Sequence, residues 1–223
     1  AQDATHYFML VRTDKAAPKQ RGISFLLVDL NTVGIEVRPI RTLAGHEEFC
    51  EVFFQDVRVP RENLVGGLNE GWSVAKALLG FERLFLGSPK LSQYALGRLA
   101  DLGRSAGLFD DPLFVDRYTQ LALDVSELQG LYTRYVNQVR RGEPLGADIS
   151  MLKIWASETY SRITNLMVDA AGSAGGMDGQ IAFPGGNVDV LGQFYNARPA
   201  TIYGGTSEVQ RNILAKNVLD LPA

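Results

Sequence analysis

The first residue in this sequence that could do chemistry is Glu82, a carboxylate set within an apolar helical pattern. The residues three and four positions away on either side are Leu78, Leu79, Phe85 and Leu86. Since residues at these spacings share a helix face, the carboxylate projects from an apolar stripe rather than from the wet face. One interpretation is a side chain at the edge of the stripe that bends to solvent or pairs with Arg83 or Lys76. The other is a general base in a dry pocket, able to take a proton from carbon.

A second candidate is the segment 202–212, which reads Ile-Tyr-Gly-Gly-Thr-Ser-Glu-Val-Gln-Arg-Asn. Gly204 and Gly205 let the backbone approach a ligand closely. Thr206 or Ser207 then caps a helix whose first free amides form a site for an anion. As bare chemistry such a helix start is most often only a cap, so both interpretations stay open.

Other common catalytic groups are missing from the sequence. His6 and His46 have no metal-ligand spacing between them or to Cys50, which sets aside metal catalysis and Cys-His catalysis. The sequence holds no G-x-S-x-G or G-x-x-x-x-G-K-[ST] motif, so the commonest hydrolase and nucleotide-phosphate sites are excluded. A single cysteine cannot form an internal disulfide, and we expect a reducing, cytoplasmic location.

The composition narrows the class of protein. The chain has 223 residues, of which 46% are hydrophobic, enough to bury a sizeable core. Its 22 Lys and Arg against 25 Asp and Glu give a net charge of -3, and no basic stretch is interleaved with aromatic residues as in a nucleic-acid groove. No apolar run approaches the roughly 20 residues that span a bilayer. We therefore expect neither a nucleic-acid partner nor a membrane.

The spacing of apolar residues predicts strands first and helices afterwards. Strands are predicted over 6–12, 23–30, 35–40 and 50–59, where short apolar runs are bounded by turn residues. Helices are predicted over 70–103, 112–141 and 147–170, with a fourth that begins at Thr206 or Ser207. The glycine-rich residues 172–205 are predicted to be irregular. The expected fold is α+β, with the end of a β-barrel-like domain at 1–63 and a four-helix bundle at 64–223.

Five ordered pieces of the sequence together resemble the acyl-CoA dehydrogenase family. They are residues 21–25 (Arg-Gly-Ile-Ser-Phe), 53–60 (Phe-Phe-Gln-Asp-Val-Arg-Val-Pro), 68–72 (Leu-Asn-Glu-Gly-Trp), 81–83 (Phe-Glu-Arg) and 203–212. Their order matches the family from the last strands of its middle β domain to the end of its C-terminal helical domain. The family's N-terminal domain and its Trp-x-Thr-Ser segment, which packs on the flavin ring, would precede Ala1, so we expect a part of a longer protein.

The resemblance implies a flavoenzyme that makes an acyl-CoA thioester α,β-unsaturated. A carboxylate removes the α proton while the β hydrogen leaves as hydride to N5 of FAD, and electron-transfer flavoprotein reoxidises the flavin. Many members carry that carboxylate directly after the Tyr of the terminal motif, where this chain has Gly204. Members resembling isovaleryl-CoA and long-chain dehydrogenases carry it just before an Arg on a helix, and Glu82 with Arg83 matches that arrangement. The resemblance therefore makes Glu82 the expected base.

The resemblance also implies which residues bind the substrate. Arg83, Tyr203, Gly204 and Gly205 match the substrate side of the family's site. The backbone N–H of Gly204 can hydrogen-bond the thioester carbonyl and stabilise the developing enolate without a side chain. Because position 204 carries no side chain, we expect the freed volume to admit a branched or bulky acyl group.

The implied FAD contacts match the family unevenly. Thr206, Ser207 and Glu208 match the segment that contacts FAD at the start of the last helix. Asp169 and Gly172 lie where the family has a Gln-x-x-Gly-Gly-x-Gly turn that reaches the FAD of a neighbouring subunit. Here the turn reads Asp-Ala-Ala-Gly-Ser-Ala-Gly, and the family's Arg-x-x-Phe-Gly segment is unrecognisable over 104–109. These departures concern the adenosine end of the cofactor or the identity of the partner subunit.

Assembly and function leave alternatives open. We expect a dimer or tetramer of related or identical subunits, with a homotetramer as in the family. One alternative function is a non-catalytic, structural subunit of a hetero-oligomer, favoured by Gly204 and by the altered inter-subunit turn. Another is a flavin oxidase or monooxygenase on the same fold. Glu82 in its apolar stripe argues against the structural subunit.

Overall fold

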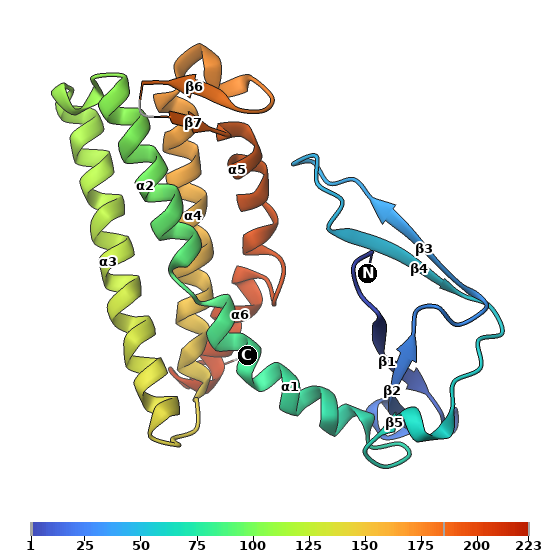
Figure 1. Cartoon of the computed structure of the whole chain (residues 1–223). Helices are drawn as coiled ribbons and strands as arrows, with labels where there is room; N and C mark the ends of the chain where they lie inside the picture. Colours follow the sequence, from blue (N-terminus) through green and yellow to red (C-terminus); the bar gives the residue numbers. More distant parts are fainter. Residues whose placement is uncertain (1, 185, 223) are drawn as a thin grey trace. The chain divides into compact units, whose positions relative to one another are not determined.

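The computed structural model describes residues 2–184 and 186–222, and its chain divides into two compact units (Figure 1). The first, Ala1–Glu82, holds the strands of two small sheets, and the second, Arg83–Ala223, is mainly helical. The mixed α and β composition is as predicted. The barrel-like sheet, the four-helix bundle and a domain boundary between residues 63 and 64 stay predictions.

The strands of the first unit form two antiparallel sheets. They are β1 (His6–Arg12), β2 (Ile23–Asp29), β3 (Ile35–Ile40), β4 (Phe49–Phe54) and β5 (Leu64–Val65). One sheet has the order β1-β2-β5, and the other is the β3–β4 hairpin. The strand predicted over 50–59 ends at Phe54. Asp56 adopts a φ of +50°, a left-handed conformation that does not continue a strand.

The helices are more numerous than the sequence pattern predicts. They are α1 (Gly71–Leu86), α2 (Lys90–Ser105), α3 (Pro112–Arg140), α4 (Ser150–Ala170), α5 (Val190–Ala197) and α6 (Ser207–Asn217). The single helix predicted over 70–103 is wrong, since the chain leaves the helix between Leu86 and Lys90. Pro89 lies in this break, and proline both lacks an N–H and disfavours helical backbone in the residue before it.

Side chains cap the starts of two helices. The carboxylate of Asp111 accepts the Leu113 N–H at 3.0 Å at the start of α3. The Thr206 hydroxyl accepts the Val209 N–H at 3.2 Å at the start of α6, which confirms the predicted cap.

The segment predicted to be irregular, 172–205, contains regular structure. It holds the hairpin of β6 (Ile181–Phe183) with β7 (Gly186–Val188), and it also holds α5. The prediction was wrong here because strands of three residues and a helix of eight are too short for a periodic pattern to emerge from the surrounding glycines.

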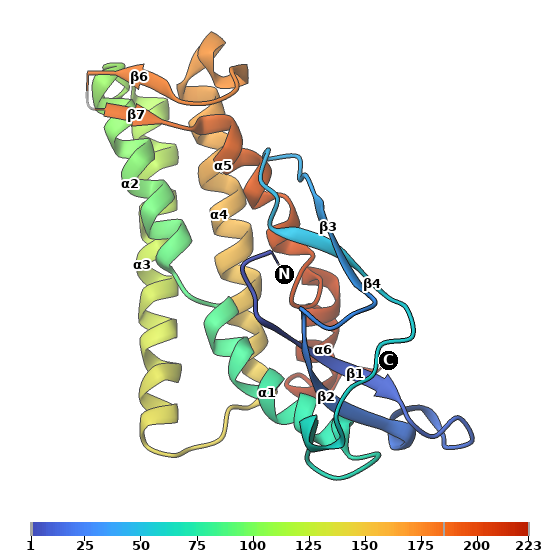
Figure 2. The same cartoon turned by 45° about the vertical axis from the view of Figure 1, so that its right-hand side comes forward.

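Helix α4 is the centre of the second unit. It packs against α2, α3, α5 and α6, and Figures 1 and 2 show α2, α3 and α4 running side by side. The core between them is fully or almost fully buried at Leu99, Leu121, Ile163 and Met167. Burying each such side chain contributes about 1.5–3 kcal/mol, so the apolar face of α4 fixes the positions of the helices around it.

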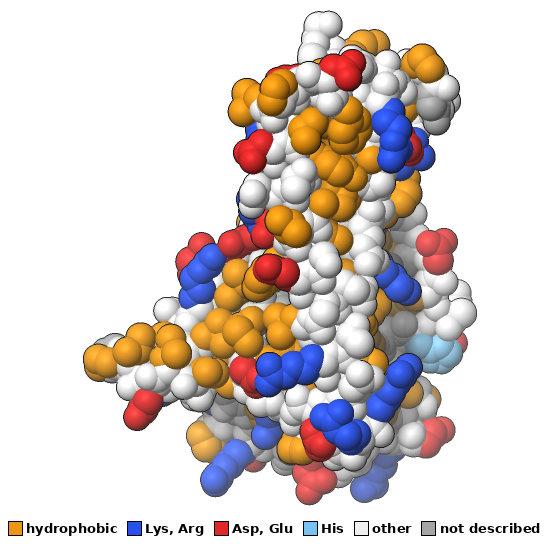
Figure 3. All heavy atoms as spheres, turned by 90° about the vertical axis from the view of Figure 1, so that its left-hand side faces the viewer, with side chains coloured by type: hydrophobic (Ala, Val, Ile, Leu, Met, Phe, Trp, Pro, Cys, Tyr) orange, Lys and Arg blue, Asp and Glu red, His pale blue; other side chains and the backbone are white. Residues whose placement is uncertain are grey.

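Apolar side chains are also present on the surface of the helices. Figure 3 shows hydrophobic side chains gathered on one face of the molecule. Among the exposed ones are Leu91 and Tyr94 on α2 and Leu113 and Leu123 on α3. Within the described residues, no helix combines the length and apolar character needed to cross a membrane.

Replacing Ile163 by Ala is expected to lower the free energy of unfolding by about 2–4 kcal/mol, because the side chain is 0% exposed and leaves a cavity on α4. The matched control is Leu123→Ala on α3, where the side chain is 53% exposed and the expected change is below about 0.5 kcal/mol. Chemical denaturation of the whole protein measures both. Equal losses in the two variants would contradict this description of the core.

Candidate active site

The segment that leads into α6 is held in one shape by two glycines and by hydrogen bonds. Gly204 and Gly205 have φ angles of +64° and +91°, in the left-handed region that glycine adopts without strain. The Tyr203 N–H donates to the Pro199 carbonyl at 2.9 Å, and the Gln210 side-chain amide donates to the Gly204 carbonyl at 3.0 Å. Residues 203–205, called the glycine segment below, are therefore fixed from both sides.

Leu86 packs against Gly204 at the point where a side chain would begin. A Cβ atom at position 204 would overlap Leu86 Cδ1. Because protein interiors are close-packed, even a methyl group fits there only if Leu86 moves. Leu86 occupies the place of the first side-chain atom at position 204, and the expectation that a bulky acyl group is admitted there stays a prediction.

Arg83 and Gly204, two of the predicted substrate residues, border the same small hollow. The hollow lies within the second unit, at the end of α1 and the starts of α4 and α6. Its lining consists of Arg83, Leu86, Ile149, Ser150, Lys153, Gly204 and Gln210. Because two of these residues are basic, the hollow favours an electron-rich atom over a cation.

Tyr203 borders a neighbouring hollow that shares Leu86 and Lys153 with the first. Tyr160 lies in the same lining, and its hydroxyl donates to the Gln193 carbonyl at 3.4 Å. Burial, reinforced by the nearby Tyr203, raises the pKa of Tyr160 to about 12. The Tyr160 hydroxyl therefore stays protonated near neutral pH and acts as a hydrogen-bond donor.

Lys153 is a candidate functional residue that sequence reasoning missed. Its side chain is 4% exposed, and its Nζ has no hydrogen-bond partner among the described residues. Burial lowers the pKa of Lys153, with Glu158 and Glu208 acting in the opposite direction. A signal was present in the sequence, because Lys153 interrupts an apolar run on a predicted helix, and lysine is rarely fully buried.

Glu82 lies near the end of α1 and is exposed. Leu78 and Phe85 flank it at helical spacing and are 52% and 76% exposed. The apolar stripe is thus present, but it is open to solvent as the edge-of-stripe interpretation expects. At Leu78, Glu82 and Phe85 the described residues form no dry pocket, whereas Leu86 packs against Gly204. The side chains of residues 79–81, which include Leu79 of the predicted stripe, lie outside the described part.

The start of α6 fits the FAD contacts that the resemblance implies. Ser207 is 4% exposed, and its Oγ lacks a hydrogen-bond partner in the described part of the chain. Glu208 accepts hydrogen bonds from its own N–H and from the Thr206 hydroxyl, which lower the pKa of its carboxyl group. A free hydroxyl beside helix-start amides is a donor set suited to a phosphate or a sugar hydroxyl.

The other predicted FAD residues lie at the opposite end of α4. Asp169 forms an ion pair with Arg117 at 2.8 Å. Gly172 has a φ of +56°, and a Cβ there would meet nothing within 4 Å, so the backbone is open to a ligand. Asp169 and Lys153 are 16 residues apart on α4, or about 24 Å along the helix. The two predicted groups therefore cannot contact the same part of one cofactor.

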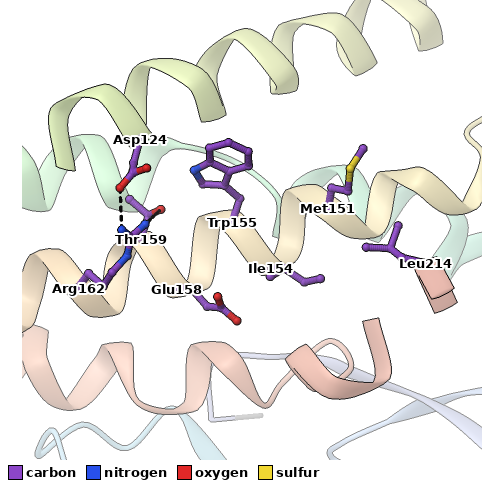
Figure 4. A pocket seen from close by; sticks show the side chains of 8 residues that line it. All are labelled: Asp124, Met151, Ile154, Trp155, Glu158, Thr159, Arg162 and Leu214. Atoms are coloured by element: carbon purple, nitrogen blue, oxygen red, sulfur yellow. Dashed lines mark hydrogen bonds and ion pairs between the residues drawn. The ribbon is translucent and has the colours of Figure 1, made fainter. Parts of the chain in front are cut away.

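A separate hollow of about 350 Å³ contains none of the predicted site residues (Figure 4). Its lining is Asp124, Met151, Ile154, Trp155, Glu158, Thr159, Arg162 and Leu214. Figure 4 shows most of these side chains projecting from α4, with Arg162 paired to Asp124 at 2.8 Å. Glu158 is paired to Arg211 at 2.7 Å. Because these charges are already paired, the hollow offers apolar surface rather than a catalytic group.

Replacing Gly204 by Ala is expected to lower the free energy of unfolding by about 1–3 kcal/mol, because it adds left-handed strain and an overlap with Leu86. Leu86→Ala removes the overlapping atom. In a double-mutant cycle we therefore expect the double variant to lose about 1 kcal/mol less unfolding free energy than the sum of the two single variants. The control is Gly107→Ala, where φ is +68° and the space is open, so strain acts alone. Additive losses for Gly204 and Leu86 would contradict the packing described.

Comparison with known proteins identifies relatives along almost the whole chain. Residues 69–219 match the family model "Acyl-CoA dehydrogenase, C-terminal domain". The acyl-CoA dehydrogenase IpdE1 of Mycobacterium tuberculosis is 35% identical over 96% of this chain, which covers 55% of that protein. IpdE1 of Mycolicibacterium smegmatis is 36% identical, with 53% of its length covered. The chain thus spans about half the length of these curated relatives.

Solved structures agree with the sequence comparison. A steroid acyl-CoA dehydrogenase, Tcur3481-Tcur3483, superposes with a TM-score of 0.89 at 25% identity, over 99% of this chain and 58% of that chain. The ChsE4-ChsE5 complex from Mycobacterium tuberculosis superposes with a TM-score of 0.83 at 27% identity, over 100% of this chain and 58% of that chain. Since the family model covers more than half of its residues, the chain belongs to the acyl-CoA dehydrogenase family, whose members depend on FAD.

Proposed function

We propose that this chain carries the C-terminal part of the active site of an acyl-CoA dehydrogenase, with Glu82 as the base that removes the α proton. The observation that carries the proposal is the packing of Leu86 against Gly204. It leaves no room for a carboxylate at 204, so the base comes from another element. Glu82 lies four residues before Leu86 on α1, and residues at this spacing share a helix face.

In this proposal the glycine segment binds the thioester. The backbone N–H of Gly204 donates to the thioester oxygen, where negative charge develops as the α proton leaves. The hydrogen bond from Gln210 holds the Gly204 carbonyl, which belongs to the peptide directly after the one that carries the Gly204 N–H, so it restrains the neighbouring peptide. Arg83 adds a positive charge at the border of the same hollow, where it favours the developing enolate.

The FAD site is divided between the two ends of α4. Thr206, Ser207 and Glu208 would hold one cofactor at the start of α6, through the unpaired Ser207 hydroxyl and the helix-start amides. Asp169 and Gly172 would face the cofactor of a neighbouring subunit. When bound, FAD supplies the acceptor for the β hydride, and electron-transfer flavoprotein is the proposed acceptor of the electrons.

The proposed substrates are acyl-CoA thioesters whose acyl group carries a ring. The support comes from the relatives rather than from volume at Gly204. One solved relative is a steroid acyl-CoA dehydrogenase, and a relative from Syntrophus aciditrophicus, 29% identical, is a cyclohexane-1-carbonyl-CoA dehydrogenase.

A related rather than identical partner subunit is also proposed. Asp169 stands where the family has Gln, and its carboxylate is already paired with Arg117. The turn that would contact a neighbouring subunit's cofactor therefore differs from the family's turn. Solved neighbours include the two-component ChsE4-ChsE5 complex. In such an assembly this chain could instead be the non-catalytic subunit, and the Glu82 experiment decides between the two roles.

Changing Glu82 to Gln in the whole protein is expected to slow acyl-CoA-dependent bleaching of flavin absorbance by at least about 10³-fold, because the amide cannot accept the α proton. Stopped-flow absorbance measures the rate under anaerobic conditions. The control is Glu127→Gln on α3, an exposed glutamate far along the chain, which should bleach at the wild-type rate. Wild-type bleaching in Glu82→Gln would refute Glu82 as the base and favour the non-catalytic role.

A panel of thioesters tests the substrate class. Cyclohexane-1-carbonyl-CoA is expected to bleach the flavin at least about tenfold faster than hexanoyl-CoA or isovaleryl-CoA, because a pocket shaped for a ring holds slender chains less well. The measurement compares kcat/KM for the three compounds with one preparation of the protein. A clear preference for hexanoyl-CoA would rule out the ring-bearing class.

A further inference from the structure

The ammonium of Lys153 is buried without a partner at the border of the proposed site. Lys153 shares its helix face with Ala156, Ser157 and Tyr160, all of them buried, so the side chain runs along the interior of the helical unit. Its Nζ makes no hydrogen bond within the described part of the chain. An unpaired buried charge lowers stability, whereas Met or Leu would fill this position without that cost. Folding therefore gives no reason for a lysine here.

The two carboxylates that act electrostatically on Lys153 already have other partners. Glu158 and Glu208 both act on Lys153 electrostatically. Glu158, however, is held by Arg211 in an ion pair of 2.7 Å, and Glu208 is held by the start of α6. The positive charge of Lys153 is thus only partly compensated, which leaves it available to an additional negative charge.

Both hollows that Lys153 borders also include one residue of the glycine segment. Lys153 and Gly204 border the first hollow, and Lys153 and Tyr203 border the second. Leu86 occupies the place where a side chain at position 204 would begin. Lys153 therefore borders the same hollows as the segment whose N–H the proposed function assigns to the thioester oxygen.

We propose that Lys153 is a positioning residue of this site, whose buried ammonium borders the same hollows as the glycine segment and favours negative charge on the oxygen bound by the Gly204 N–H. The inference rests on the proposed function. The effect is electrostatic and acts through the segment, so Lys153 itself does not touch the substrate. It acts on the state in which the thioester oxygen is charged, and hardly on the neutral thioester before proton removal.

The test compares Lys153→Met, which removes the charge, with Lys153→Arg, which keeps it, in the whole FAD-containing protein. Cyclohexane-1-carbonyl-CoA, or whichever thioester of the panel the wild type oxidises fastest, is the probe. We expect Lys153→Met to lower the rate of flavin bleaching at saturation by about 10–100-fold, with the half-saturating concentration changed less than about twofold. Lys153→Arg should stay within about tenfold of the wild type. Lys216→Met, at an exposed position on α6, is the control and should be unchanged.

The melting temperature provides a second readout. Replacing a lysine that stabilises the fold would lower the melting temperature, whereas this inference predicts no decrease. Because the charge is unpaired, Lys153→Met should melt at the same temperature as the wild type or higher. A wild-type bleaching rate in Lys153→Met, an Arg variant as slow as the Met variant, or a Met variant that melts lower or fails to fold would each overturn the inference. If the wild type itself bleaches with none of the three thioesters, the proposed function fails and this inference fails with it.

Discussion

The contact between Leu86 and Gly204 is the constraint on which the rest of the site depends. It joins the end of α1 to the segment before α6 and leaves space for backbone only at position 204. A site built on that segment can therefore offer hydrogen-bond donors from the peptide, but not a carboxylate. The proposed base is therefore on another element, and the helix that supplies Leu86 also carries Glu82 one turn earlier.

Helix α4 is central to the core and also carries residues of the proposed site at both of its ends. Its apolar face packs against four other helices, and at its first turns that face carries Lys153 beside the glycine segment. Its far end carries Asp169 and the open backbone at Gly172, about 24 Å away. In the proposed function, α4 thus separates the substrate end of the site from the end assigned to a neighbouring subunit.

The sequence predicted most of the long elements and the cap at Thr206, because a cap acts through a local hydrogen bond. It failed where tertiary packing decides. Periodicity could not find the break at Pro89 within one apolar pattern, or the short elements after residue 172. In the candidate site, too, local features were predictable and tertiary contacts were not. Gly204 was identified from its motif, but no local pattern could show that Leu86 fills the space beside it, since those residues are 118 positions apart.

The central claim is that Glu82 and the Gly204 N–H act on opposite sides of one proton transfer. A crystal structure of the whole protein with FAD and a non-reactive acyl-CoA analogue tests it most directly. The account predicts a Glu82 carboxylate oxygen about 3–3.5 Å from the α carbon and the thioester oxygen within hydrogen-bonding distance of the Gly204 N–H. A different carboxylate at the α carbon, or a thioester oxygen bound away from Gly204, would contradict it.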